Sequence, residues 1–294
     1  MNWKKLAWRT YKVIVYNIYF LLWQLPKGRR IARALRSVIF RLAPTMIPNP
    51  LLINGSQLYW YPSTCAYAVD YFFGEYEPET THFFEGLLRP GMVTVDLGAG
   101  IGYYSLIFAR KVGDTGRVYA FEPQPSNCNV FRQSIRANGY DNIVTIVEKC
   151  VSDRPGFVTL HFTKAGDEGA SLYERKEVSG RQLVVEAVTL DKFFESEGWP
   201  KVHVMKMDIE GAEKAALEGM RVLVAKNPSL KLVIEFNSKV QAAVGISPTE
   251  YFDTLIELGF SKFCALRKGL QAIDIPRDIP YFFQSEPVNL LCER

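Results

Sequence analysis

Short apolar runs alternate with amphipathic helical segments along most of this chain. The clearest run covers residues 93–97, whose β-branched and aliphatic side chains are typical of a strand that is buried on both faces. Comparable runs occur at residues 118–121, 143–153, 202–207 and 230–236, with helical segments between them. This alternation predicts an α/β fold that is built on a mostly parallel sheet.

Two later segments predict structure outside the parallel part of the sheet. Residues 157–162 and 183–188 alternate between apolar and polar positions, which predicts a hairpin. The polar insertion between them, residues 164–181, lacks the periodicity of a core element and is either a mobile lid over the substrate or a surface loop. The end of the chain predicts a helix that begins near Pro248, followed by two strands that close the sheet edge as an antiparallel pair.

The basic residues are concentrated in the first part of the chain. Ten Lys and Arg residues and no acidic residue precede Asp70, so this part carries +10, and the remainder carries −6 because the whole chain carries +4. Residues 1–43 combine a basic amphipathic segment with an apolar run that is shorter than the roughly 20 residues of a spanning helix. We predict that they form helices on an anionic membrane surface. The alternative is that they pack on the body of the protein or within a homodimer.

Prolines and an Asn-Gly pair separate this basic leader from the rest of the chain. Residues 44–73 are predicted to be a linker with a short β-hairpin at Asn54 and Gly55, and residues 74–294 to be the main domain. The five Cys residues are scattered without a Cys-x-x-Cys pair, which argues against zinc and disulfides and suits the cytoplasm. We therefore expect a cytoplasmic protein, peripheral or monotopic at the membrane. Its basic residues lie on apolar helices rather than beside stacking aromatics, so we expect no nucleic-acid partner.

Three closely spaced glycines follow the strand at residues 93–97. Gly98, Gly100 and Gly102 permit positive φ angles and let a ligand approach the backbone. The helix that is predicted from about Tyr103 directs its free N–H groups to the same place. This strand, turn and helix therefore predict a cofactor-binding element.

Two carboxylates indicate which cofactor this turn binds. The G-x-G-x-G spacing differs from the G-x-G-x-x-G of dinucleotide sites, and Asp96, just before the turn, would repel a pyrophosphate but accept an ammonium group. Glu122, at the end of the next strand, is placed to accept hydrogen bonds from ribose hydroxyls. S-adenosylmethionine satisfies both demands and is the predicted cofactor. A nicotinamide-dependent oxidoreductase is the alternative that would use the same glycines.

Four sequence blocks carry a resemblance to a known family. They are VTVDLGAGIGYYSLIFAR, GRVYAFEPQPSNCNVFRQSIRANG, CVSDRPG and VMKMDIEGAEKAALEGM, in this order. With them the chain resembles the FkbM-type S-adenosylmethionine-dependent methyltransferases from about Gly74 to its end, although members often carry Asn in place of Gly100. The resemblance implies a Rossmann-like class I methyltransferase fold with a seven-stranded, mostly parallel sheet and an antiparallel C-terminal edge. The basic amphipathic helices would precede this fold.

The residue pattern and the resemblance together give a set of cofactor contacts. The resemblance places Tyr76 and Glu77 over the methionine end of the cofactor, and Val151 and Ser152 at its adenine ring. Asp208 joins the set because it follows the strand at residues 202–207, beside the place predicted for the sulfonium methyl group. The complete predicted set is Tyr76, Glu77, Asp96, Gly98, Ala99, Gly100, Gly102, Tyr103, Glu122, Val151, Ser152 and Asp208.

Carboxylates at two neighbouring strand ends are the candidate catalytic groups. Asp208 and Glu210 follow one strand and Glu235 lies at the end of the next, where ligands bind in open α/β sheets. Methyl transfer needs mainly positioning of the acceptor, plus a base that takes the proton of a hydroxyl group. Asp208 is the first choice for this base and Glu235 the second. No metal ligands are predicted, although Mg²⁺ bound at these strand ends is an alternative way to acidify the acceptor.

The predicted activity combines the cofactor, the resemblance and the leader. The resemblance implies a hydroxyl acceptor, and the basic leader implies a membrane surface. We therefore predict an S-adenosylmethionine-dependent O-methyltransferase that acts on a hydroxyl group of a sugar in a lipid-linked glycan or a glycolipid. Besides the oxidoreductase, a non-catalytic scaffold that binds the cofactor and is tethered to the membrane is a rival. Such a scaffold would not need Asp208, Glu210 or Glu235.

Overall fold

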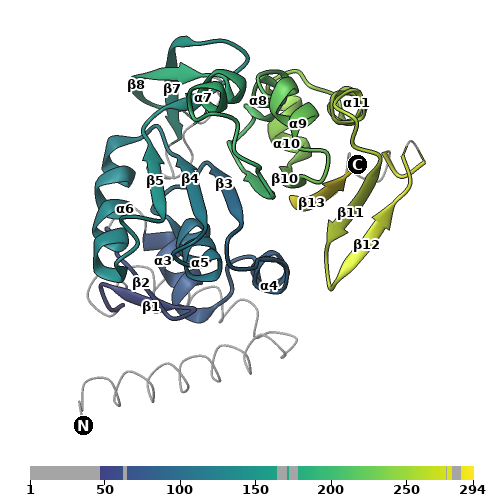
Figure 1. Cartoon of the computed structure of the whole chain (residues 1–294). Coiled ribbons are helices and arrows are strands. Elements are labelled where there is room, and N and C mark those ends of the chain that lie inside the picture. Colours follow the sequence, from purple (N-terminus) through teal and green to yellow (C-terminus); the bar gives the residue numbers. More distant parts are fainter. Residues whose placement is uncertain (1–46, 62–64, 164–170, 172–177, 276, 280–285) are drawn as a thin grey trace, which may run out of the picture.

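The computed structural model describes residues 47–61, 65–163, 171, 178–275, 277–279 and 286–294. The leader at residues 1–43 lies outside the described residues, as does most of the insertion at residues 164–181. The described residues form a central sheet that is covered by helices on both faces, with a smaller sheet beside it (Figure 1).

Eight strands form the main sheet, in the spatial order β12-β11-β13-β10-β9-β3-β4-β5. Their bounds are Leu270–Ile273 for β12, Lys262–Leu266 for β11, Val288–Glu293 for β13, Lys231–Phe236 for β10, Val204–Met207 for β9, Val93–Leu97 for β3, Arg117–Phe121 for β4 and Val144–Val147 for β5. Neighbouring strands from β10 to β5 are parallel, whereas β13 runs antiparallel to both β10 and β11. The mostly parallel sheet with an antiparallel C-terminal edge is therefore confirmed.

The predicted number of seven strands is one too few. Residues 270–273 fold back on β11 as the additional antiparallel strand β12. Lys268 and Gly269 both have positive φ angles, and such residues make the tight turns that join hairpin strands. This Lys-Gly pair is the local turn signal for the additional strand at the sheet edge.

Two layers of helices cover the faces of the main sheet. One face packs against α7 (Leu190–Ser196), α8 (Glu213–Glu218), α9 (Arg221–Lys226) and α11 (Pro248–Glu257). The other packs against α3 (Cys65–Phe73), α4 (Pro78–Leu87), α5 (Tyr103–Val112) and α6 (Pro125–Asn138). The short helix α10 (Ser238–Ala243) follows β10. Fully buried aromatic residues fill both layers, such as Phe252 on the first face and Phe108 on the second.

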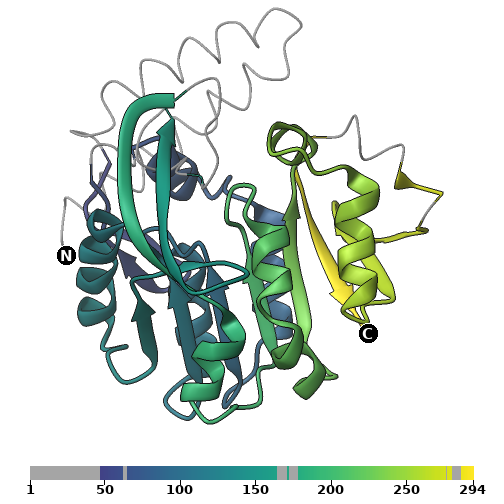
Figure 2. The same cartoon turned by 90° about the horizontal axis from the view of Figure 1, so that it is seen from above.

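Residues 143–153, predicted to be one strand, contribute to two different sheets. Val144–Val147 is β5 of the main sheet, whereas Cys150–Val151 is β6 of a three-stranded sheet with β7 (Gly156–Thr163) and β8 (Val178–Val188). The backbone N–H of Lys149 bonds to the carbonyl of Val147, and this turn breaks the strand. Strands β7 and β8 pair as an antiparallel hairpin, which projects from the main sheet (Figures 1 and 2).

The segment before the main sheet packs on the body of the protein. Strands β1 (Leu51–Ile53) and β2 (Ser56–Leu58) pair antiparallel around Asn54 and Gly55. The backbone N–H of Gln57 donates to the side-chain oxygen of Asn138, at 2.8 Å, which ties β2 to the end of α6. The hairpin is thus held against α6 rather than standing apart from it.

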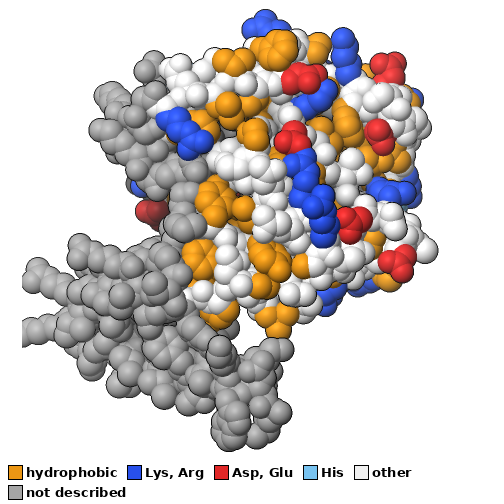
Figure 3. All heavy atoms as spheres, turned by 90° about the vertical axis from the view of Figure 1, so that its left-hand side faces the viewer, with side chains coloured by type: hydrophobic (Ala, Val, Ile, Leu, Met, Phe, Trp, Pro, Cys, Tyr) orange, Lys and Arg blue, Asp and Glu red, His pale blue; other side chains and the backbone are white. Residues whose placement is uncertain are grey.

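Hydrophobic side chains on the surface occur in small groups. Figure 3 shows the face on the left-hand side of Figure 1, where such groups alternate with charged and other polar side chains. The most exposed large hydrophobic residues are Phe157 and Leu52, which lie on separate hairpins. Within the described ranges, no helix combines the length and the apolar character that crossing a membrane requires.

Candidate functional site

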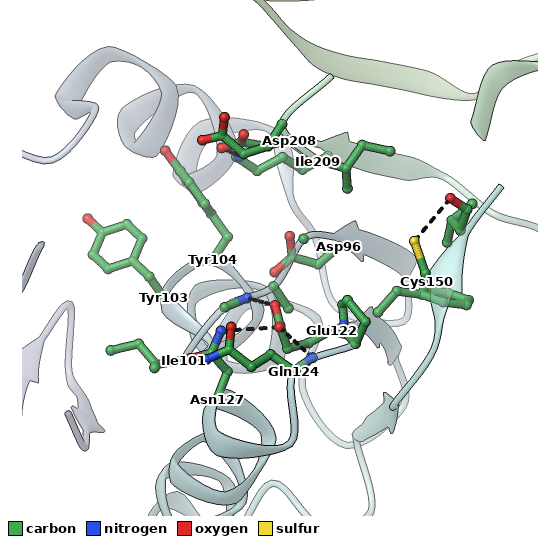
Figure 4. A pocket seen from close by; sticks show the side chains of 18 of the residues that line it. Asp96, Ile101, Tyr103, Tyr104, Glu122, Gln124, Asn127, Cys150, Asp208 and Ile209 are labelled. Atoms are coloured by element: carbon green, nitrogen blue, oxygen red, sulfur yellow. Dashed lines mark hydrogen bonds and ion pairs between the residues drawn. The ribbon is translucent and has the colours of Figure 1, made fainter. Parts of the chain in front are cut away.

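A pocket opens beyond the carboxyl ends of β3, β4 and β9 (Figure 4). Strand order reverses here. The next strand of the main sheet along the chain after β3, which is β4, lies on one side of β3, and the later strand β9 lies on its other side. Such switch points are where open α/β sheets bind ligands. With its open mouth included, the pocket has a volume of about 1130 Å³, which is ample for a nucleoside-sized ligand.

The glycine turn after β3 forms part of the pocket wall. Gly98 has a φ of 81°, and a Cβ atom there would lie 1.9 Å from the backbone oxygen of Asp208. Gly102 has a φ of 96°, and a Cβ atom there would lie 2.2 Å from the ring of Phe131. Both positions therefore require glycine, and the turn packs directly on the loop that follows β9.

Glu122, just after β4, is the centre of a hydrogen-bond network (Figure 4). Its Oε2 accepts from the backbone N–H of Gly100 at 2.8 Å, and its Oε1 accepts from the backbone N–H of Gln124 at 2.9 Å and from Nδ2 of Asn127 at 3.1 Å. Burial raises the pKa of Glu122, and these three bonds act in the opposite direction. A carboxylate has about four acceptor sites, so one remains for a ligand hydroxyl.

Asp96 is buried at the end of β3 and lines the same pocket. Its Oδ2 accepts a hydrogen bond from Oγ of Ser105 at 2.6 Å. Burial raises the pKa of Asp96, while the charge of Lys206 and the bond from Ser105 lower it. A carboxylate in this position gives the pocket a negative electrostatic potential next to the glycine turn.

Lys206 is a buried cation in the middle of β9, with 2% of its side chain exposed. Its Nζ lies 2.9 Å from Oδ2 of Asp208 and 4.7 Å from the centre of the Tyr104 ring. Burial lowers the pKa of Lys206, but Asp208, Glu77 and Asp96 together raise it above its ordinary value. Lys206 is therefore charged and forms a buried ion pair with Asp208.

Five tyrosines line the pocket, and the ring of one of them, Tyr104, lies against Lys206, the partner of Asp208. They are Tyr67, Tyr71, Tyr76, Tyr103 and Tyr104. The rings of Tyr71 and Tyr103 stack with centroids 4.6 Å apart, and Tyr76 meets both edge-on. Burial raises the pKa of Tyr76 and of Tyr104 well above the ordinary value, so neither phenol acts as a base near neutral pH.

Glu77, predicted as a cofactor contact, is bound to other protein groups and does not line the pocket. It precedes α4 in a left-handed conformation with a φ of 39°. Its Oε2 accepts hydrogen bonds from the hydroxyl of Tyr104 at 2.6 Å and from Nδ2 of Asn289 at 2.9 Å. Glu77 thus joins α4 to α5 and to β13.

The loop between β9 and α8 carries Asp208 and Glu210 into the pocket. Glu210 has a φ of 54°, an uncommon angle for a residue with a side chain, and such strain occurs often at functional sites. Its backbone carbonyl accepts a hydrogen bond from Oγ of Ser171 at 2.7 Å. Buried Glu213 accepts from the backbone N–H of Ile209 at 3.2 Å, which fixes the other end of the loop.

Glu235 lies near this loop but outside the pocket lining. Burial raises the pKa of Glu235 to about 9, and the negative charges of Asp208 and Glu210 add to this effect. Asp208 and Glu235, the two carboxyl groups that the sequence predicts as bases, therefore have opposite surroundings. Only Asp208 has a lysine within hydrogen-bond distance of its carboxylate.

The structure brings most of the predicted site residues together in one pocket. Those that line it are Tyr76, Asp96, Gly98, Ala99, Gly100, Tyr103, Glu122, Val151, Asp208 and Glu210. Those outside its lining are Glu77, Gly102, Ser152 and Glu235. Ser152 instead donates its hydroxyl to Asp153.

Sequence reasoning missed several residues that line the pocket, among them Gln124, Asn127, Tyr104 and Lys206. Lys206 had a visible signal, because a charged residue inside the apolar run of a doubly buried strand needs a partner. Gln124 and Asn127 follow Glu122 closely and could have been included as the first turn of the next helix. Over the ranges that the structure describes, no three His, Cys, Asp or Glu side chains are grouped so that they could hold a metal ion.

Comparison with protein families gives one match that covers more than half of the chain. The family model of the methyltransferase FkbM domain matches residues 96–262. This range includes the glycine turn, Glu122 and the loop that carries Asp208 and Glu210. It ends before β12 and β13.

Curated proteins match shorter parts of the chain. A protein-L-isoaspartate O-methyltransferase of Methanothermobacter thermautotrophicus is 29% identical over 112 residues, which are 37% of this chain and 51% of that protein. A ribosomal RNA large subunit methyltransferase E of Lawsonia intracellularis is 41% identical over 66 residues, 20% of this chain and 33% of that protein. The chain thus spans about half or less of the length of these relatives.

Among solved structures, an S-adenosylmethionine-dependent O-methyltransferase of Thermotoga maritima aligns with 74% of this chain and 65% of its own. The sequence identity is 14% and the TM-score is 0.43.

Proposed function

Because the chain belongs to the FkbM methyltransferase family, we propose that it transfers a methyl group from S-adenosylmethionine to a sugar hydroxyl group, in a lipid-linked glycan or a glycolipid at a membrane surface. The observation that carries this proposal is the pocket that is lined jointly by Glu122, the glycine turn and the ion pair of Lys206 and Asp208. S-adenosylmethionine is the cofactor that the family membership implies.

Three features of the pocket fit this cofactor. Gly100 has a φ of 56° and no atom within 4 Å of its Cβ position, so the turn leaves room for a ligand. Buried Oε1 of Gln124 has no hydrogen-bond partner among the described residues, which suits a donor such as the amino group of adenine. Four carboxylates and two lysines line the pocket, a balance that disfavours the pyrophosphate of the nicotinamide alternative.

The proposed contacts follow the order of the residues along the pocket. Glu122 would hold the ribose, Asp96 and the glycine turn would receive the ammonium end, and Val151 and Gln124 would border the adenine ring. When bound, S-adenosylmethionine supplies an electrophilic methyl group. The protein then has to orient the acceptor oxygen and take its proton.

The composition of the pocket end near Asp208 supports a sugar as acceptor. Aromatic rings offer apolar faces, and carboxylates accept hydrogen bonds from hydroxyl groups. The tyrosines and the carboxylates of Asp208 and Glu210 provide both in one place. Asp208, whose carboxylate is oriented by its ion pair with Lys206, would accept the proton of the attacking hydroxyl group.

Labelled-methyl transfer into a cell lysate tests this proposal. The purified protein and labelled S-adenosylmethionine are added to a heat-treated lysate, which is then separated into lipid, glycan, protein and nucleic-acid fractions. Label in the lipid or glycan fraction supports the proposal. Label in the protein or nucleic-acid fraction alone would contradict it and would instead match the acceptors in the names of the curated relatives.

Glu122→Gln is expected to weaken the binding of S-adenosylmethionine by about 10- to 100-fold. The reason is that hydrogen bonds to a charged group contribute about 1.5–3 kcal/mol, and the new amide would also face the backbone N–H donors that now bind Glu122. Calorimetric titration measures the affinity. Glu197→Gln, which changes an exposed carboxylate away from the pocket, is the matched control. An unchanged affinity in Glu122→Gln would contradict the assigned contact.

Residues 1–43 are proposed to attach the protein to an anionic membrane. The support is their excess of basic residues on apolar, amphipathic segments. We expect the full chain to sediment with vesicles that contain anionic lipid, less so at high salt, and a chain that lacks residues 1–43 to stay in solution. Equal sedimentation of both chains would contradict the proposal, and a change from dimer to monomer on truncation would point to the dimer alternative.

A further inference from the structure

Two pairs of polar side chains lie on the face of the main sheet that α4 and α5 cover. Asp96 of β3 pairs in register with Lys206 of β9, and Glu235 of β10 pairs in register with Asn289 of β13. The neighbouring pair Val233 and Leu291 belongs to the hydrophobic cluster on this face, so the side chains two positions away, on the same face, point there too. The pair of Glu235 and Asn289 lies two positions further along its strands than the first pair, because Val233 pairs in register with Lys206.

Asn289 has a fixed orientation and one buried atom without a partner. Its Nδ2 donates to Oε2 of Glu77 at 2.9 Å and to Oγ1 of Thr80 at 3.0 Å. Since a carboxylate only accepts hydrogen bonds, these contacts identify the nitrogen. The other side-chain atom, Oδ1, is buried and has no donor among the described residues. A buried acceptor of this kind is costly unless a donor is supplied.

Glu235 is the side chain placed to supply that donor. Residues directly opposite each other in an antiparallel pair have their Cβ atoms about 4.5–5.5 Å apart, which is within reach of a glutamate side chain. A carboxyl group can donate only when it carries a proton. Protonation of Glu235 would therefore satisfy Oδ1 of Asn289.

The charges around Glu235 favour its protonated form. Asp208 and Glu210 act on it from the loop after β9 and Glu77 from the start of α4, whereas the cation Lys206 acts in the opposite direction. Lys206 is already paired with Asp208. From α11, the hydroxyl of Tyr251 donates to the backbone carbonyl of Glu235 and not to its carboxyl group. Burial and these negative neighbours raise the pKa of Glu235 to about 9.

We propose that Glu235 is a protonated positioning residue, whose neutral carboxyl group donates a hydrogen bond to Asn289. Asn289 in turn holds Glu77, and Glu77 holds the hydroxyl of Tyr104, whose ring lies against Lys206. Glu235 therefore acts on Asp208 through this chain of contacts and is not the second base that the sequence predicts. In enzymes that use two carboxyl groups, different surroundings give the two groups different pKa values. This difference is a recurrent basis for assigning acid and base roles.

The pH dependence of unfolding tests the protonation directly. A group that binds its proton more tightly in the folded state than in the unfolded state stabilises the fold fully at pH values below its unfolded pKa. This contribution is lost as the pH rises towards the folded pKa. For Glu235 the unfolded pKa is near 4.5 and the folded pKa is about 9. We expect the folding equilibrium constant of the parent to fall, relative to that of Glu235→Gln, by up to tenfold per pH unit between pH 5 and 9. Urea unfolding of the full chain at several pH values measures this ratio.

Three variants make the unfolding result specific to Glu235. Glu257→Gln changes an exposed carboxylate and is expected to keep the pH dependence of the parent. Glu235→Leu removes the donor and is expected to be less stable than Glu235→Gln at every pH, because Oδ1 of Asn289 stays without a donor. A parallel pH dependence of the parent and Glu235→Gln, or a failure of Glu235→Gln to fold, would overturn the proposal.

The expected effect of Glu235 on methyl transfer rests on the proposed function. Two further measurements distinguish a failure of this proposal from a failure of the proposed function. In the lysate assay at pH 7, Glu235→Gln is expected to lose less than tenfold in rate and to keep its activity near pH 9, where the parent declines. A loss of a hundredfold or more at pH 7 would make Glu235 a base and overturn the proposal. If the parent transfers no label, the proposed function fails. Infrared absorption of a protonated carboxyl group, present in the parent at pH 7 and absent in Glu235→Gln, then still decides the protonation state.

Discussion

Asp208→Asn is expected to lower the rate of methyl transfer by about 10²–10⁴-fold, the usual contribution of a general base. Asp208 lines the pocket together with the tyrosines, and Nζ of Lys206 lies 2.9 Å from its carboxylate. Asparagine keeps the size of the side chain and its ability to accept a bond from Lys206, but cannot take a proton. The affinity for S-adenosylmethionine should change by less than tenfold, because Glu122 and the glycine turn are untouched. Initial rates in the lysate assay and calorimetric titration measure the two effects.

Asp253→Asn is the matched control for this experiment, since Asp253 is exposed on α11 and lies outside the cofactor pocket. A rate within threefold of the parent in Asp208→Asn would mean that no base at this position is needed. Positioning of the acceptor would then account for the catalysis, because proximity alone can lower a barrier by roughly 7–11 kcal/mol. Such a result would leave the cofactor site intact and remove only the assigned base.

Lys206→Met is expected to lower the free energy of unfolding by about 3–5 kcal/mol, the usual effect of removing one partner of a buried ion pair. Methionine fills a similar volume, so the loss is mainly electrostatic. Asp208 would lose its cation while Asp96 and Glu77 remain nearby, and the Tyr104 ring would lose its contact with the ammonium group. Urea unfolding at pH 7 measures the change.

Two comparisons make the Lys206 result specific. Lys214→Met removes a half-exposed lysine from its ion pair with Glu250 and should cost at most about 1 kcal/mol. The double variant Lys206→Met with Asp208→Asn should recover part of the stability, since it removes the unpaired carboxylate as well. A double variant that is less stable than Lys206→Met would show that the charge of Asp208 is not what Lys206 balances.

The pocket residues near the glycine turn could be placed from the sequence because they lie at the ends of two consecutive strands and in the turn and helix between them. Asp96 and the glycines stand in a fixed order after an apolar run, and Glu122 ends the next strand. Each position follows from the alternation of buried strands and helices, without knowledge of distant contacts. The same holds for Asp208, which ends a strand that the pattern marks clearly.

Contacts between distant residues could not be predicted in this way. Glu77 and Asn289 are 212 positions apart, and nothing local to either indicates that they bond to each other. Glu77 was therefore assigned to the cofactor, whereas the structure pairs it with Tyr104 and Asn289. The break between β5 and β6 escaped prediction for a related reason, because the pairing partner of β6 is β8, more than thirty residues later. Hydrophobic periodicity marks which face of a strand is buried, but not which strand lies beside it.

The close approach of Gly98 to the backbone of Asp208 makes two loops mechanically dependent on each other. With 1.9 Å between the position of a Cβ atom and the carbonyl oxygen, neither loop has room to shift toward the other. A ligand that pushes on the glycine turn would therefore also push on the segment that carries Asp208. The two loops therefore form one stiff wall of the pocket, with Gly98 and the backbone of Asp208 in direct contact.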